Sequence, residues 1–171
     1  MRRFSTRELT FAAIVAALYA VMGYFGDTFG MTFGPVQIRF AEALTVLPFL
    51  FPSAAPGLVL GCLVTNLLSP YGIADIVFGT LATAIAAFLT TRVPRWYLAA
   101  VPPIVVNALI LPPLWAWAET GGFGGAFWAA CGFNALTFVA GEAAVCCGLG
   151  KLLLRALPKT GLPAKLAAPK K

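Results

Sequence analysis

The sequence predicts an all-α integral membrane protein, a bundle of six transmembrane helices with both termini in the cytoplasm. The first observation behind this prediction is composition, because 60% of the 171 residues are hydrophobic and only 11% are charged. A soluble domain carries about 25% charged residues, and the mean hydropathy of +0.89 agrees with a lipid-facing surface. The second is length, since six helices of ~20 residues would use ~120 residues and leave only short loops. The third is a one-sided distribution of lysine and arginine.

Glycine, proline and charged residues divide the chain into six apolar runs. The first helix is expected over residues 9–25, and we expect it to remain uncleaved because no small-residue cleavage site follows it. Residues 26–37 hold three glycines and one proline and are expected to form an exposed loop. The other five helices are expected over residues 39–51, 57–68, 73–91, 97–117 and 127–154. The second and third are shorter than the ~17 residues of a short span, and the prolines in residues 52–56 favour two tight antiparallel helices over one re-entrant hairpin.

An even number of spans places both termini on one side of the membrane. Eleven of the twelve basic residues then fall on that side, at helix ends and in the tail, and Arg39 alone lies at the opposite end. Basic residues are enriched in cytoplasmic loops, so this side is expected to be cytoplasmic. We expect residues 1–157 to form the membrane domain and residues 158–171 to be a disordered, basic cytoplasmic tail.

Composition also excludes several kinds of function. The chain has no histidine, which excludes a histidine-based catalytic triad, a zinc–histidine site and haem–histidine ligation. The four cysteines lie in apolar runs without a CxxC pair and are expected to be small buried hydrophobes. With three serines and no paired aspartates at metal-ligand spacing, we expect no enzyme, no cofactor and no metal. The net charge of +6 sits at helix ends and therefore indicates topology, with no nucleic-acid partner.

Polar side chains gather at the outer ends of the expected helices. Ionisable residues within spans cost ~2.5–3.5 kcal/mol each on insertion scales and normally face the bundle interior or water. Their coincidence at one end favours a binding site more than any single residue does. The candidate substrate-binding residues are Gln37, Arg39, Glu42, Asn66, Asp75, Trp115, Glu119 and Asn134.

Several of these residues also have a purely structural interpretation. Arg39 and Glu42 lie three residues apart on one face, which fits a salt bridge between the second helix and its loop. Asp75 fits a helix N-terminus, where the helix dipole favours a carboxylate. The tryptophans fit an interfacial belt, and Glu142, deeper in the last helix, is expected to hydrogen-bond between helices.

The first helix carries a row of small residues. Ala12, Ala16 and Ala20 recur every four residues, and such rows let another helix approach closely. Packing within the bundle and docking of a partner subunit are both open explanations.

The segment from Val36 to Pro48, VQIRFAEALTVLP, resembles the signature of the QueT family. The similarity continues through DIVFGTLAT, which begins at Asp75, and Gly141-Glu142 in the last helix also fits. The resemblance implies a multi-pass subunit of a bacterial plasma membrane, the substrate-binding (S) component of an energy-coupling factor (ECF) transporter. Such a subunit binds its solute outside and docks through an alanine-rich first helix, which Ala12, Ala16 and Ala20 match. The partners implied are one transmembrane coupling subunit and two ATPases, since the chain has no GxxxxGK[ST] sequence of its own.

The resemblance implies a queuosine precursor as substrate, a 7-deazaguanine such as preQ1, preQ0 or queuine. A guanine-like edge presents adjacent N–H donors that one carboxylate can accept, and its carbonyl needs a donor. The outer half is expected to hold four carboxylates and only one cation, Arg39. This excess of negative charge favours the cationic aminomethyl form, preQ1. An S component for another vitamin-like solute remains an alternative, as does a self-contained transporter or channel.

Overall fold

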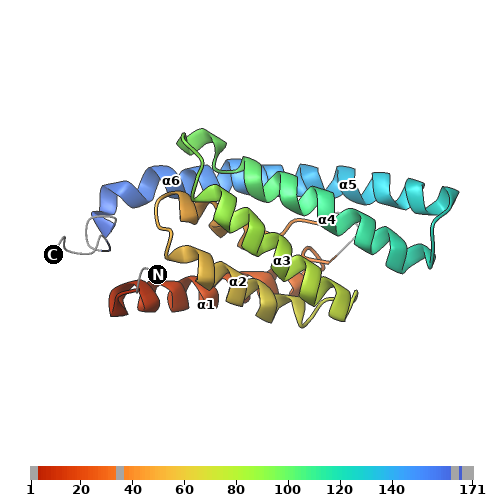
Figure 1. Ribbon diagram of the computed structural model, residues 1–171, viewed down its shortest axis with the longest axis horizontal. Helices are drawn as coiled ribbons and strands as arrows, with labels where there is room; N and C mark the ends of the chain where they lie inside the picture. Colours follow the sequence, from red (N-terminus) through yellow and green to blue (C-terminus); the bar gives the residue numbers. More distant parts are fainter. Residues whose placement is uncertain (1–3, 34–36, 163–165, 167–171) are drawn as a thin grey trace.

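The computed structural model describes residues 4–33, 37–162 and 166, and every regular element in that part of the chain is a helix (Figure 1). Most are α-helices, and the short elements labelled η are 3-10 helices or, for η3, a π-helix. In chain order they are α1 (Thr6–Thr28), η1 (Phe40–Phe49), α2 (Ala54–Asn66), α3 (Ile73–Thr90), η2 (Trp96–Leu98), α4 (Val101–Thr120), α5 (Gly125–Val145), η3 (Cys146–Gly150), α6 (Lys151–Ala156) and η4 (Leu157–Thr160). The prediction of an all-helical fold is confirmed.

Helices that follow one another in the chain pack side by side. Contacts join α1 to α2, α2 to α3, α3 to α4 and α4 to α5, while α5, η3 and α6 form one long rod. The start of α1 and the end of α6 lie at the same end of the bundle (Figure 1). The 3-10 helix η1 contacts all six α-helices and η3, so it forms the centre of the bundle.

The second expected helix is this 3-10 helix, with Pro48 inside it. Its residues from Ala41 to Pro48 are all buried. A helix that is apolar on nearly every side has to be buried, because it has no polar face to turn toward water. A 3-10 helix rises ~2.0 Å per residue, so ten residues extend ~20 Å, whereas an α-helix of that length extends ~15 Å. Thr45 stabilises the element locally, because its hydroxyl donates a 2.6 Å hydrogen bond to the carbonyl of Glu42.

The loop before η1 differs from the exposed loop that the sequence predicts. Helix α1 continues to Thr28, and the side chains of Thr32 and Gln37 are buried. The Thr32 hydroxyl donates to the carbonyl of Gly23 in α1, and the backbone N–H of Ile38 donates to the carbonyl of Met31. These hydrogen bonds satisfy polar groups that would otherwise need water, so the segment folds into the bundle. Gly34 and Pro35 lie outside the described residues.

Four helical segments are long and apolar enough to cross a membrane: α1, α3, Trp96–Thr120 and Gly125–Thr160. The 10-residue η1 and the 13-residue α2 are shorter, so six spans stays a prediction. Large apolar side chains are exposed on the outside of the bundle, while many of the side chains buried inside it are polar. This distribution is the one expected of a protein surrounded by lipid.

Candidate functional site

The buried polar side chains form a cluster around the segment that leads into η1. Arg39 directly precedes η1 in an extended conformation, and its side chain is 6% exposed. Its Nη2 atom lies 3.7 Å from Oδ2 of Asp75, and its Nε donates a 3.4 Å hydrogen bond to the carbonyl of Thr32. The guanidinium carbon also lies 5.2, 5.3 and 5.9 Å from the ring centres of Phe33, Trp115 and Phe138. One carboxylate and three aromatic rings thus compensate this buried cation.

Asp75 and Trp115 form one wall of the cluster. Asp75 stands in the first turn of α3, where the helix dipole favours its charge. Its Oδ1 accepts a 3.2 Å hydrogen bond from the indole Nε1 of Trp115 in α4. The Trp115 ring stacks on Tyr71 at 5.5 Å and meets the ring of Phe138 edge-on at 5.4 Å. The hydrogen bond and ring contacts hold this tryptophan in one orientation, in the interior and not in an interfacial belt.

Glu42 lies in the first turn of η1 and is 1% exposed. Its Oε1 accepts a 2.5 Å hydrogen bond from the phenol of Tyr19, in the middle of α1. Its Oε2 accepts no hydrogen bond from the described residues. The salt bridge to Arg39 that the spacing suggests is replaced by two separate pairs, Arg39 with Asp75 and Glu42 with Tyr19.

A third carboxylate, that of Glu142, reaches the cluster from α5. The Nδ2 of Asn107 in α4 donates a 2.8 Å hydrogen bond to Oε1 of Glu142, and both side chains are 2% exposed. This is the interhelical hydrogen bond expected of Glu142. In addition, Oδ1 of Asn107, Oε2 of Glu142 and Oε1 of the neighbouring Gln37 accept no hydrogen bond from the described residues.

The cluster therefore has a surplus of acceptors. Three buried carboxylates face one guanidinium. Among the described residues, five buried oxygens have no hydrogen-bond donor, those of Gln37, Glu42, Asp75, Asn107 and Glu142. The Nη2 of Arg39 likewise has no hydrogen-bond acceptor in that part of the chain, although it forms the 3.7 Å ion pair with Oδ2 of Asp75. Buried polar groups cost free energy unless they are paired. The arrangement suits a flat ligand that brings several N–H donors and one carbonyl acceptor.

Two of the eight predicted site residues, Glu119 in the last turn of α4 and Asn134 in α5, lie at the rim of the cluster and are less buried. Glu119 and Asn134 are joined by hydrogen bonds of 3.2 and 3.3 Å, and Glu119 also accepts a 3.0 Å hydrogen bond from the hydroxyl of Tyr71. Burial, this hydrogen bond and the charge of Glu119 raise the pKa of Tyr71 to about 12, so its hydroxyl remains a donor at neutral pH. Because Tyr71 stacks on Trp115, the rim is connected to the interior cluster.

Asn66 is buried, but its amide serves the packing of α2 on α3. Its Nδ2 donates to the backbone carbonyl of Asp75 at 3.2 Å and contacts the thiol of Cys62 at 3.3 Å. The structure thus places Gln37, Arg39, Glu42, Asp75 and Trp115 in the cluster. Asn66 lies beside Asp75, outside the cluster.

The sequence interpretation missed Tyr19 and Asn107, and it gave Glu142 no place in the site. A lone asparagine in an apolar span was a usable signal for Asn107. The signal for Tyr19 was weaker, because a tyrosine is common in apolar helices and only its hydroxyl enters the cluster.

The row of alanines on α1 meets α2 in part. Ala12 is buried, and a methyl group on Gly57 of α2 would collide with its carbonyl. A methyl group on Gly61 would lie 2.8 Å from the carbonyl of Ala16. Ala16 and Ala20 are half-buried. Internal packing therefore accounts for Ala12, and the docking role of the row stays a prediction.

Two of the four cysteines, Cys62 and Cys146, are buried as expected, whereas Cys131 is half-buried and Cys147 is exposed. All four are free thiols. Within the described ranges, no three His, Cys, Asp or Glu residues are grouped so as to hold a metal ion.

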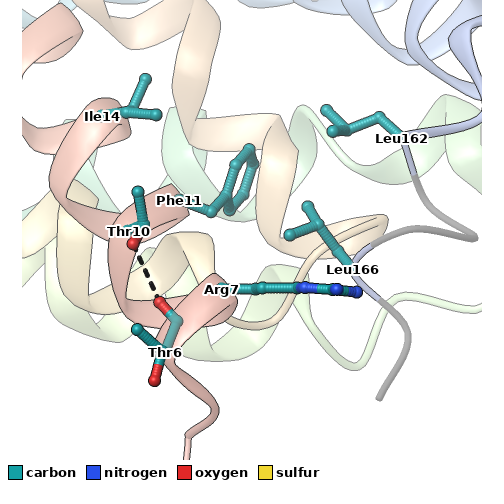
Figure 2. Close-up of a pocket in the computed structure, with 7 residues that line it drawn as sticks. All are labelled: Thr6, Arg7, Thr10, Phe11, Ile14, Leu162 and Leu166. Carbon is teal, nitrogen blue, oxygen red and sulfur yellow. Dashed lines mark hydrogen bonds between the residues drawn. The ribbon is translucent and has the colours of Figure 1, made fainter. Parts of the chain in front are cut away.

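A hollow of about 540 Å³ lies away from the cluster, between the first turns of α1 and the tail (Figure 2). Apolar side chains, two threonines and Arg7 line it, and none of the cluster's carboxylates does. In Figure 2, Phe11 and Ile14 of α1 are drawn opposite Leu162 and Leu166, with Arg7 beside Leu166. The hollow lacks the acceptors that an N–H-rich ligand needs, so we do not assign the substrate to it.

Comparison with known proteins agrees with a transport role. The family model described as QueT transporter matches residues 9–159. A curated relative, the queuosine precursor transporter QueT of Lactococcus lactis subsp. cremoris (strain MG1363), is 29% identical over 85 residues. That match spans about half of this chain and half of the relative. No solved structure matches the chain. Members of this family are transporters and not enzymes. Because the family model covers most of the sequence, this chain belongs to the QueT transporter family.

Proposed function

We propose that this chain is the substrate-binding subunit of an ECF transporter that takes up a queuosine precursor, a 7-deazaguanine. One observation carries the proposal: a transporter-family protein buries four acceptor oxygens that have no donor among the described residues, those of Gln37, Glu42, Asn107 and Glu142, beside the Arg39–Asp75 ion pair. The donor edge of a guanine-like ring complements these oxygens. Its carbonyl oxygen complements Arg39.

The arrangement of the cluster suggests a role for each group. Glu42 offers a free Oε2 for the adjacent N1–H and 2-amino donors of the ring. Arg39 offers Nη2 to the ring carbonyl, and Trp115 offers an aromatic wall. Glu119 and Asn134, joined at the rim, would meet the ligand at the entrance.

We propose six spans with both termini in the cytoplasm, in the plasma membrane of a bacterium. Four segments have the length of full spans, and η1 and α2 each extend ~20 Å, so they would be short spans sheltered by the others. Support comes from the start of α1 and the end of α6, which lie at the same end of the bundle (Figure 1), and from the one-sided basic residues. Exposed aromatic residues stand at both ends of the bundle, Trp96 and Tyr97 at one and Trp117 and Trp128 at the other.

The proposed partners are a transmembrane coupling subunit and two ATPase subunits. We propose that α1 docks on the coupling subunit through Ala16 and Ala20. Their small side chains are half-buried at the edge of the α1–α2 contact, and Ala13 and Ala17 beside them are exposed. An exposed row of small residues permits the close approach of another helix.

Titration calorimetry of the purified protein tests the substrate. We expect saturable binding of at least one of preQ1, preQ0 and queuine, and weaker binding of guanine. Absence of binding to all three precursors would contradict the proposal. Purification of the tagged chain tests the partners, because an S component brings a coupling subunit and ATPases with it. A protein that transports the solute in vesicles on its own would be a self-contained transporter.

A further inference from the structure

Two carboxylates of the cluster have only neutral partners. Glu42 accepts a hydrogen bond from Tyr19, and Glu142 accepts one from Asn107. Arg39, the buried cation of the cluster, is paired with Asp75. A carboxylate that stays ionised in the interior needs an opposite charge or several donors to compensate it.

Glu142 and Glu42 belong to the same part of the cluster. Cys146, one turn after Glu142 on the same face of the rod, donates from its thiol to the backbone carbonyl of Glu42 at 3.4 Å. On the other side, Gly141 packs against the carbonyl of Gln37 so closely that a methyl group there would collide with it. The helix on both sides of Glu142 is therefore packed against the backbone of Gln37 and Glu42.

We propose that Glu142, oriented by Asn107, is the specificity-determining residue that selects a 7-deazaguanine with a cationic aminomethyl arm over one with a neutral substituent. This inference rests on the proposed function and assigns a residue to the ligand's arm. An ammonium group brings three N–H donors and one positive charge. The unpaired oxygens of Glu142, Asn107 and Gln37 are acceptors for those donors. A neutral nitrile brings only another acceptor, which these oxygens would repel.

The other carboxylates fit this role less well. Asp75 already has a guanidinium partner and an indole donor. Glu119 is exposed, so water and salt weaken its charge. Glu42 has its own task at the ring edge in the proposed function.

Calorimetric titration with the aminomethyl and nitrile forms of the ligand, at low salt, tests this assignment. We expect wild-type protein to bind the aminomethyl form roughly 10- to 150-fold more tightly, the range of one charge-assisted hydrogen bond. Glu142→Gln keeps an acceptor for Asn107 and removes the charge. We expect it to lower aminomethyl binding by that factor and to leave nitrile binding unchanged. Asp27→Asn is the matched control, since it removes a carboxylate near the end of α1 and should preserve the preference.

Each outcome distinguishes the inference from the proposed function. If wild-type protein binds both forms equally, or Glu142→Gln keeps the wild-type preference, the inference is overturned and the proposed function stands. If neither form binds but queuine does, the inference is likewise overturned and the proposed function stands. If none of the three precursors binds, the proposed function itself fails. Should Glu142→Gln not fold, Asn107→Ala decides the matter, because it disorients Glu142 without changing any charge. A several-fold smaller preference supports the inference, and an unchanged preference overturns it.

Discussion

The phenol of Tyr19 donates a 2.5 Å hydrogen bond to Oε1 of Glu42, and no residue that the structure describes donates to Oε2 of that carboxylate. This bond joins the middle of α1 to the first turn of η1, at the centre of the bundle. The helix proposed to dock on a partner therefore also positions a carboxylate proposed to bind the substrate. Variants at Tyr19, Ala16 and Ala20 therefore separate these two roles of α1.

Glu42→Gln should weaken binding of a 7-deazaguanine by roughly 5- to 150-fold. The change keeps the shape of the side chain but turns one acceptor toward the ring edge into a donor, and such a buried mismatch costs ~1–3 kcal/mol. Titration calorimetry measures the loss. An analogue without the 2-amino group should lose much less affinity, and an equal loss for both ligands would contradict the assignment of Glu42 to that edge.

Tyr19→Phe should lower the stability of the protein by about 1–3 kcal/mol, because it leaves a buried carboxylate with no donor. Thermal unfolding of the detergent-solubilised protein measures the effect. Tyr24→Phe is the matched control, since Tyr24 lies on the same helix and is exposed. Equal melting temperatures for the two variants would show that the Tyr19 hydroxyl contributes nothing.

Ala20→Leu and Ala16→Leu should abolish uptake in cells that contain all partner subunits, while solute binding remains largely intact. A larger side chain blocks close helix approach. Ala12→Leu is the contrasting variant, because Ala12 packs on α2 and the change should lower thermal stability. Normal transport by both Ala16→Leu and Ala20→Leu would refute the docking role.

Gly141→Ala should lower both stability and ligand affinity, because the added methyl group collides with the carbonyl of Gln37. Moving that backbone would displace Gln37 and the following Arg39, so we expect an overpacking cost of about 1–3 kcal/mol. Gly132→Ala in the same helix is the control, since a methyl group there meets open space. That variant should be neutral or up to ~1 kcal/mol more stable. Similar melting temperatures and affinities for the two variants would exclude a role for this contact.

The sequence by itself determined the helical fold and most helix positions. Apolar runs interrupted by glycine and proline are local signals, and they correctly located α1, α2, α3, α4 and the α5–α6 rod. The resemblance of the segment around Arg39 and Glu42 also identified the family that the family model matches. Such signals can be recognised without tertiary information, because they depend only on residues that are close together in the sequence.

Only the tertiary structure decided the partners of the buried charges. Spacing in the sequence suggested that Arg39 pairs with Glu42, whereas the fold pairs Arg39 with Asp75 and Glu42 with Tyr19. It also buried Thr32 and Gln37 ahead of η1 and packed Gly141 against the carbonyl of Gln37. The Tyr19–Glu42 hydrogen bond joins residues 23 positions apart, and the thiol of Cys146 contacts the carbonyl of Glu42 across 104 positions. The physical reason is that a buried polar group is satisfied by whichever partner packing brings near, and sequence spacing does not encode that choice.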